Sequence, residues 1–400
     1  MAQTIKCPAE KRCGGCALLS IPYEEQLERK HREVSRLLKP FCKAEPVIGM
    51  EAPFHYRNKV HAVFGQRRDG TVISGTYEEG THRIVPVESC LIEDETADQI
   101  IGTIRRLIPS FKYSIFREEN GTGLIRHVLV RVGKATGQVM VVLVTASRIL
   151  PSKRNFVRAL LKEHPQITTI VQNINDRKTS MILGEREEVL YGPGYIEDRL
   201  CSLSFRISSR SFYQVNPVQT EKLYSTAIRL AGLTKNSRVI DAYSGIGTIG
   251  LIAAAQAGEV ISIELNAEAV RDARTNAKRN KVANIRFFRA DATQFMKEAA
   301  DTALRVDTVF MDPPRTGSTP EFIRAAAKLK PGCVVYISCN PVTLARDLEV
   351  FKACGYTARR AVPVDMFPQC SDIETVCCLY HQKKDFISVP YEPKAAEYLK

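Results

Sequence analysis

The run Asp241-Ala242-Tyr243-Ser244-Gly245-Ile246-Gly247-Thr248-Ile249-Gly250 follows a short apolar stretch and opens a helical pattern near residue 248. Glu264 ends the next predicted strand. Glycines in such a strand-to-helix turn let the backbone approach a nucleotide cofactor closely, and the following acid can accept hydrogen bonds from both ribose hydroxyls. Taken alone, this turn fits a dinucleotide and S-adenosylmethionine equally well.

Strands and helices alternate around this turn. Predicted strands cover 238–242, 260–264, 285–288, 306–311 and 334–338, and predicted helices begin near 248, 267 and 319. This alternation predicts a parallel sheet whose ligand binds at the carboxyl ends of the strands. We therefore expect an α/β, Rossmann-like methyltransferase or dinucleotide-binding domain over residues 212–400.

The preceding region, 51–211, has short alternating runs separated by turns. Val128–Val132 and Val139–Thr145 flank a glycine-containing turn, which is typical of a β-hairpin. The region is predicted to be a mostly antiparallel β domain. Before it, residues 21–40 have the pattern of an amphipathic helix within a helical segment over 19–50.

The N-terminal segment, 1–18, contains three closely spaced cysteines, Cys7, Cys13 and Cys16, with two glycines between the last two. The glycines allow the backbone to fold tightly enough for three sulfurs to converge. Cys90 is the best candidate for a fourth ligand and Cys42 the alternative. Three clustered cysteines and a remote one favour an iron–sulfur cluster over a zinc site or unliganded thiols. Cys370, in a polar loop, is not assigned a role.

The chain has 400 residues, a formal net charge of +13 and a pI near 9.2. This charge favours a polyanionic partner such as a nucleic acid. Many basic residues fall in the β domain, among them Arg126 and Arg131, where they either contact RNA or form a solvated sheet face. With neither a signal peptide nor a bilayer-length apolar run in the sequence, we expect a cytoplasmic protein without membrane association.

The sequence Asp312-Pro313-Pro314-Arg315 lies at the end of the fourth predicted strand. An acidic residue before two prolines at this place recurs in S-adenosylmethionine enzymes that act on planar bases. It therefore favours S-adenosylmethionine over a dinucleotide.

Cys339 follows the predicted strand 334–338 and is a candidate nucleophile. Uracil C5 is a poor nucleophile, but a thiolate that adds to C6 creates an enolate able to accept a methyl group. A general base must then remove the C5 proton, and Glu374 is the candidate. Cytosine C5 methylation is the competing interpretation. RNA enzymes of that kind usually have a cysteine inside the motif occupied here by Asp312–Arg315.

Taken together, these motifs resemble the bacterial RNA uracil-C5 methyltransferase family, from Cys7 to about Tyr380. The resemblance implies that Cys339 is the nucleophile and Glu374 the base. It also implies that S-adenosylmethionine is contacted by Gln214, Tyr243, Glu264 and Asp312. Phe212 would stack near the target base, and a 4Fe-4S cluster would be bound by Cys7, Cys13, Cys16 and Cys90.

Within that family, the chain is most similar to the iron–sulfur enzymes of 23S rRNA, but Cys7 is too near its start to leave room for their frequent OB-type barrel. RNA contact is therefore expected from the β domain, with Arg126 and Arg131 as candidates. The expected substrate is 23S rRNA; the alternatives are tRNA, or a non-catalytic iron–sulfur protein that binds RNA. The resemblance also implies that 19–50 packs on the catalytic domain. A monomer is expected, and residues 386–400 have no family role.

Overall fold

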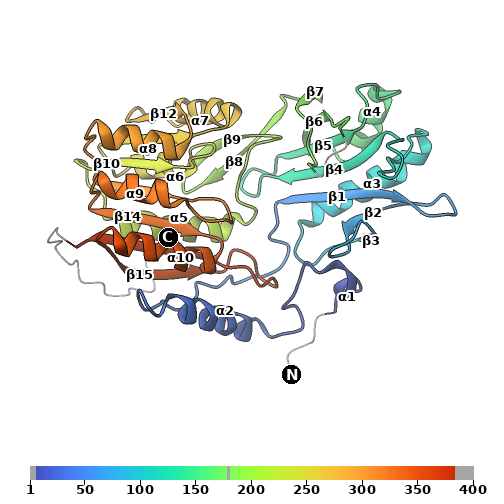
Figure 1. The fold of residues 1–400 in the computed structure, drawn as a ribbon. Helices are drawn as coiled ribbons and strands as arrows, with labels where there is room; N and C mark the ends of the chain where they lie inside the picture. Colours follow the sequence, from blue (N-terminus) through green and yellow to red (C-terminus); the bar gives the residue numbers. More distant parts are fainter. Residues whose placement is uncertain (1–5, 178–180, 383–400) are drawn as a thin grey trace.

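The computed structural model describes residues 6–177 and 181–382. Figure 1 shows an α/β domain on the left and a β domain on the right, with an N-terminal helical segment below the α/β domain. Residues 386–400, to which sequence analysis gives no role, lie outside the described part of the chain.

The α/β domain is built on a seven-stranded sheet with strand order β12-β11-β10-β13-β14-β16-β15. Its strands are β10 (Arg238–Ala242), β11 (Glu259–Glu264), β12 (Ile285–Arg289), β13 (Thr308–Met311), β14 (Cys333–Ser338), β15 (Tyr356–Val364) and β16 (Glu374–His381). The first five are parallel, which confirms the predicted parallel sheet, whereas β16 and β15 add an antiparallel edge that the sequence reasoning missed.

Helices cover this sheet: α5 (Pro217–Ala231), α6 (Thr248–Ala254), α7 (Ala267–Arg279), α8 (Ala292–Asp301), α9 (Pro320–Lys328) and α10 (Pro341–Ala353). Side chains of Asn266, Asp291, Thr319 and Asn340 accept hydrogen bonds from backbone N–H groups at the starts of α7, α8, α9 and α10. These caps satisfy donors that a helix leaves free at its start, so they fix where the helices begin.

The β domain contains a second seven-stranded sheet, of order β3-β2-β1-β4-β5-β6-β7. Its strands are β1 (Lys59–Gln66), β2 (Val72–Tyr77), β3 (Ile84–Pro86), β4 (Ile125–Val132), β5 (Val139–Thr145), β6 (Ile167–Ile174) and β7 (Arg186–Tyr191). The predicted β4–β5 hairpin is confirmed. All pairs are antiparallel except β5 with β6, which run parallel and are connected through α4 (Lys153–Glu163).

The two faces of this sheet have different partners. Val128 and Val130 of β4 belong to a core with α3 (Glu95–Ser110) and α4, whereas Leu129 belongs to a core that continues into the α/β domain. A separate hairpin, β8 (Tyr195–Leu200) and β9 (Leu203–Ser208), contributes to this second core. The alternation of side chains along β4 therefore links the two domains through one continuous apolar layer.

The N-terminal segment contains α1 (Glu10–Cys13) and α2 (Tyr23–Leu38). Val34 and Leu38 of α2 are fully buried in the core of the α/β domain, and α2 packs against α10. After α2, the chain forms isolated bridges from Ala44 to Ala361 and from Ile48 to Val364. A segment that precedes the β domain in sequence therefore lies on the other domain.

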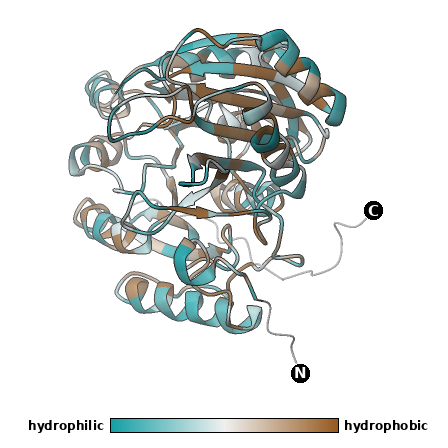
Figure 2. Cartoon of the chain, turned by 90° about the vertical axis from the view of Figure 1, so that its right-hand side faces the viewer, coloured by the Kyte–Doolittle hydropathy of each residue, from teal (hydrophilic) through white to brown (hydrophobic). Residues whose placement is uncertain are grey.

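Figure 2 shows strands that are largely hydrophobic and covering helices with extended hydrophilic stretches. This distribution follows from the burial of β13 and β14 on both faces, where all residues are buried. In the described part of the chain, no helix has both the length and the apolar character needed to cross a membrane.

Candidate active site

The glycine-rich turn between β10 and α6 is shaped by close packing. The backbone is left-handed at Tyr243, Gly245 and Gly247, with φ of 65°, 55° and 84°. At Gly250, a Cβ would lie 2.5 Å from Oγ of Ser262, so a side chain there would clash. A Cβ on Gly245 would meet nothing within 4 Å. The turn is therefore closely packed against the sheet at Gly250 and open at Gly245, as a cofactor-binding turn requires.

Asp241 holds this turn from inside the protein. Its Oδ2 accepts hydrogen bonds from the N–H of Gly250 at 2.8 Å and from Oγ of Ser262 at 3.4 Å. Burial raises the pKa of Asp241 to about 7, and the Gly250 hydrogen bond opposes that rise. Sequence analysis used Asp241 only to mark the start of the motif, whereas the structure gives it a positioning role.

Glu264 binds the same turn from β11. One carboxylate oxygen accepts a hydrogen bond from the N–H of Gly245 at 2.9 Å and the other from the N–H of Asn266 at 2.7 Å. An ionised carboxylate can accept about four hydrogen bonds, so both oxygens retain capacity for ribose hydroxyls. The geometry is compatible with the expected cofactor contact.

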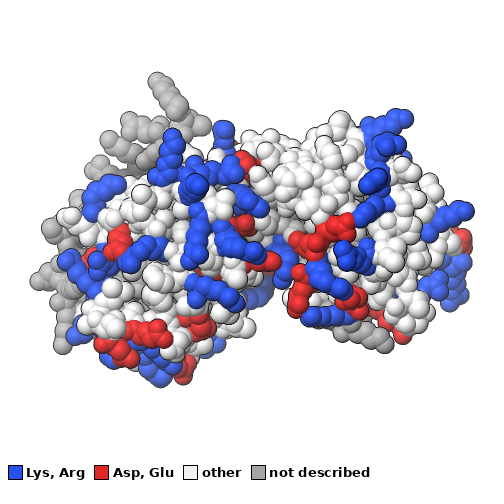
Figure 3. All heavy atoms as spheres, turned by 90° about the horizontal axis from the view of Figure 1, so that it is seen from above, with Lys and Arg blue, Asp and Glu red and all other residues white. Residues whose placement is uncertain are grey.

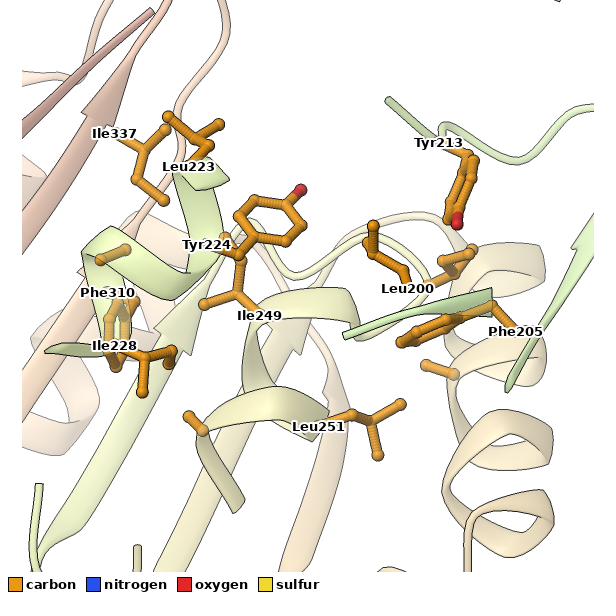
Figure 4. Packing of buried hydrophobic residues seen from close by; sticks show 14 of the residues in the cluster. Leu200, Phe205, Tyr213, Leu223, Tyr224, Ile228, Ile249, Leu251, Phe310 and Ile337 are labelled. Carbon is orange, nitrogen blue, oxygen red and sulfur yellow. The ribbon is translucent and has the colours of Figure 1, made fainter. Parts of the chain in front are cut away.

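A small cavity lies beside the open side of the turn. It is lined by four residues expected from the sequence, Phe212, Gln214, Tyr243 and Asp312, and by Tyr224 of α5, which sequence analysis did not identify. Figure 4 shows the Tyr224 ring among the buried apolar side chains of this region. The Phe212 side chain is 66% exposed, which leaves its ring available to a large substrate.

Pairing of β14 with β16 brings the candidate nucleophile beside the candidate base. Ser338 lies opposite Thr375 in the antiparallel ladder, so the adjoining residues Cys339 and Glu374 are neighbours. Burial raises the pKa of the Cys339 thiol to about 11, and the carboxylates of Glu374 and Asp312 add to that rise. These shifts show that the three groups share one electrostatic environment.

Glu374 is 4% exposed, and its Oε2 has no hydrogen-bond partner among the described residues. Burial, followed by Asp312 and Asp372, raises its pKa well above the usual range for a carboxyl. Arg315 opposes this excess of negative charge: its Nη2 donates to Asp372 at 2.7 Å, and its positive charge favours the Cys339 thiolate.

The loop before Glu374 is held by α2 through buried polar contacts. Nζ of Lys30 lies 2.6 Å from Oδ1 of Asp365, and both side chains are almost completely buried. The hydroxyl of Tyr23 donates to Oδ2 of Asp365 at 2.7 Å, and Gln26 donates to Gln369 at 2.8 Å. The N-terminal helix therefore fixes the loop that leads to the candidate base.

The cysteines expected to bind a cluster lie in the same region, between α1 and the β domain. Cys16 and Cys90 pack with Cys370 against an apolar group that includes Tyr56, and Sγ of Cys370 donates to the carbonyl of Gly15 at 2.9 Å. Cys42 instead packs in the core of the α/β domain. Within 6–177 and 181–382, no group of three or more His, Cys, Asp or Glu is arranged to hold a metal. As placed, the thiols do not form a finished ligand set.

Arg126 and Arg131 are both buried, at 4% and 1% exposed. Nη2 of Arg131 donates to the carbonyl of Ser211 at 2.9 Å, which holds the residue before Phe212. Nη1 of Arg126 donates to the carbonyls of Asn175 and Arg177, both at 2.8 Å. Neither arginine lies on an open surface, so Arg131 is placed to support the Phe212 turn and not to contact phosphate from outside.

Comparison with known proteins agrees with this site. The family described as tRNA (Uracil-5-)-methyltransferase matches residues 22–383. The chain belongs to this family. It is therefore an RNA methyltransferase that uses S-adenosylmethionine to methylate uracil at position 5.

Individual relatives extend the match over nearly the whole chain. An uncharacterized RNA methyltransferase of Halalkalibacterium halodurans is 42% identical over 378 residues, covering 93% of this chain and 82% of the relative. Another from Caldanaerobacter subterraneus is 41% identical over 374 residues, with coverages of 92% and 82%. The structure of Pyrococcus abyssi tRNA (uracil-54, C5)-methyltransferase with S-adenosyl-L-homocysteine gives a TM-score of 0.76 at 29% identity, covering 91% and 85% of the two chains.

Proposed function

We propose that this enzyme methylates uracil C5 through a covalent bond between Cys339 and C6 of the base. The observation that supports this mechanism is the position of Cys339 beside Glu374 at the end of β14, together with the Asp312 side chain that lines the cofactor cavity. No other pair of groups in the described part of this site combines a partly exposed thiol with an unpartnered buried carboxyl oxygen.

The chemical steps follow from these two groups. Sγ of Cys339 forms a bond to C6, and the electrons of the C5–C6 double bond move onto C5 and the C4 oxygen. S-adenosylmethionine, when bound, would supply an electrophilic methyl group: C5 would take it as the sulfonium S–CH3 bond breaks and S-adenosylhomocysteine leaves. Glu374 then removes the proton from C5, the C5–C6 double bond re-forms, and the thiolate leaves.

Electrostatics determine when the nucleophile forms. With a pKa of about 11, the Cys339 thiol is mostly protonated at neutral pH in the free enzyme. Arg315 favours the thiolate, while Asp312 and Glu374 oppose it. We infer that a compensating positive charge accompanies substrate binding and lowers the cost of forming the nucleophile, so that Glu374 remains available as the base.

For the substrate, we propose structured RNA, with 23S rRNA first and tRNA second. A formal charge of +13 supports a polyanion, and Figure 3 shows Lys and Arg side chains spread over both halves of one face. The tRNA alternative is supported by the Pyrococcus abyssi enzyme, whose name gives tRNA uracil-54 as its target. The presence of Gly245, Glu264 and Cys339 in the chain argues against a non-catalytic RNA-binding protein. We also propose a cytoplasmic monomer.

A structural 4Fe-4S cluster on Cys7, Cys13, Cys16 and Cys90 is a further part of the proposal. Cys13, Cys16 and Cys90 line one cavity, which supports a shared site. Their present arrangement does not fit a metal, so the segment would have to adjust, and no catalytic step is assigned to the cluster. Anaerobic purification should yield iron and sulfide in equal amounts; stoichiometric zinc without iron would contradict the assignment.

Mapping of 5-methyluridine in RNA from a strain that lacks the gene tests the proposed function. We expect one or more sites in 23S rRNA to lose the modification and to regain it with the wild-type gene. The Cys339→Ala gene is the matched control and should not restore it. Loss of the modification only from tRNA would identify tRNA as the substrate. An unchanged map in both RNAs would contradict the proposed methylation of uracil C5.

A further inference from the structure

A cavity of about 780 Å³ lies in the β domain, at the end of the β1–β2 hairpin. It is formed by β1, β2, β4 and the segment before β4, and it shares no lining residue with the cofactor cavity. Its volume is within the range of roughly 300–1,000 Å³ that is usual for ligand sites. Methyl transfer, as derived from Cys339 and Glu374, does not use it.

Positive charge dominates the rim of this cavity. Arg67, Arg68 and Arg117 are exposed lining residues, and none has an ion-pair partner among the residues that the structure describes. Two carboxylates, Glu118 and Glu119, also line the cavity, and Glu118 is engaged by neighbouring side chains of the same wall. Three unpaired guanidinium groups at one opening favour a ligand with more than one negative charge.

Two buried side chains of the wall have unused hydrogen-bonding atoms. Arg126 is 4% exposed and lies 4.3 Å over the ring of Phe116, and its Nε has no partner in the described chain. His127 is 6% exposed, and its Nδ1 is likewise without a partner. Buried polar atoms are nearly always satisfied in folded proteins, and these two belong to residues that line the cavity, so water or a ligand there can complete their bonds.

The wall also offers aromatic surface. Phe116 and Tyr77 are partly exposed, and the ring of His82 lies 5.6 Å from that of Tyr77. Flat aromatic rings beside arginines are the usual means by which proteins bind unpaired bases and their phosphates without strong sequence preference. Neither a purely anionic ligand nor a purely apolar one would use both features.

We propose that this cavity binds an unpaired nucleotide of the RNA substrate, with its base against Phe116 or Tyr77 and neighbouring phosphates at Arg67 and Arg117. This inference rests on the proposed function, since it takes RNA as the substrate. It provides a second point of attachment outside the active site. A single base captured here would orient a large RNA before a uridine reaches Cys339.

Binding of a fluorescein-labelled 12-nucleotide oligouridylate, measured by fluorescence anisotropy, tests this site directly. The double variant Arg67→Ala, Arg117→Ala should bind about tenfold more weakly, and the slope of log affinity against log salt should fall by about 1.4, as expected for two lost contacts with single-stranded phosphates. Phe116→Ala should weaken binding by about fivefold or more through lost stacking.

The matched control is Arg154→Ala, Arg158→Ala. Both arginines are exposed on α4, which covers the sheet face opposite to His127, so the same charge is removed from the same domain. Its affinity should stay within about twofold of wild type. Equal losses in the two double variants, or an unchanged affinity in Arg67→Ala, Arg117→Ala, would overturn the site. Uridine monophosphate that competes as tightly as the oligonucleotide would instead indicate a free-nucleotide site and also contradict the proposal.

A crosslinking experiment separates this site from the catalytic one. The same oligonucleotide with 4-thiouridine should crosslink, in the Cys339→Ala protein, to peptides that contain Tyr77 or Phe116. Crosslinks confined to Phe212 would overturn the second site and leave the proposed function intact. Conversely, normal crosslinking at Phe116 with no methylation of RNA by the wild-type enzyme would refute the proposed function and keep the RNA site.

Discussion

Replacing Glu374 with Gln should lower the pKa of the Cys339 thiol. In the wild-type protein this pKa is about 11, so roughly one thiol in a thousand is ionised at pH 8. Glu374 is the first charged group that contributes to the rise, after burial itself. A neutral amide at this position removes that repulsion, and we expect the pKa to fall to roughly 10. The midpoint of the Cys339 thiol titration should therefore fall by about one pH unit.

Alkylation by iodoacetamide, followed by mass spectrometry of the peptide that contains Cys339, measures this change because only the thiolate reacts. Cys333 on the same strand is 3% exposed and is an internal control that should remain unmodified. Arg315→Gln should have the opposite effect, since Arg315 lowers the pKa of the thiol. A wild-type profile with a midpoint near 8.5, or equal rates in wild type and Glu374→Gln, would refute the electrostatic coupling.

Other perturbations test the scaffold. Lys30→Met leaves Asp365 buried without its cation and should lower the free energy of unfolding, measured in urea, by about 3–5 kcal/mol. It should also lower kcat, because the loop before the base becomes less firmly held. Adding Asp365→Leu should recover part of the lost stability. Gly250→Ala places a Cβ 2.5 Å from Oγ of Ser262, so the glycine-rich turn must shift. Calorimetry should then show at least tenfold weaker binding of S-adenosylmethionine. Unchanged binding would contradict the turn geometry. Burial lowers the pKa of His127 to about 3, so below about pH 6.5 the unfolded chain takes up a proton that the folded chain does not, and the free energy of unfolding falls as the pH is lowered toward 3. In urea titrations at pH 4.5–6.5, His127→Gln should make this fall shallower by about 1.4 kcal/mol per pH unit. An identical slope in the variant and the wild type would refute this prediction.

Local patterns were sufficient to predict the cofactor turn and the parallel strands. The glycines at 245, 247 and 250 lie within one turn; Gly245 is required by its left-handed backbone, whereas Gly250 is packed against the neighbouring strands. The antiparallel pair β15–β16 was missed because an apolar run in the sequence does not indicate which strand it pairs with. Yet this pairing is what brings Glu374 to Cys339, so the site was identified from resemblance and chemistry before its geometry was known.

Long-range contacts explain what the sequence could not indicate. Arg131 carries a charge that suggested a surface, but the domain contact at Ser211 buries it. Cys370 lies 355 positions from Gly15, to whose carbonyl it donates, and no spacing rule connects such distant residues. The same holds for α2, whose amphipathic pattern predicts a buried face but not the partner that buries it.

Intact mass spectrometry of enzyme incubated with S-adenosylmethionine and RNA that carries 5-fluorouridine tests the covalent mechanism most directly. Fluorine cannot leave C5 as a cation, so the reaction should stop after methyl transfer. We predict a stable adduct whose mass equals protein plus RNA plus one methyl group, attached at Cys339, and no adduct or methyl transfer with Cys339→Ala. Methylation or adduct formation by Cys339→Ala would contradict the covalent mechanism and favour direct transfer to a nitrogen or oxygen atom.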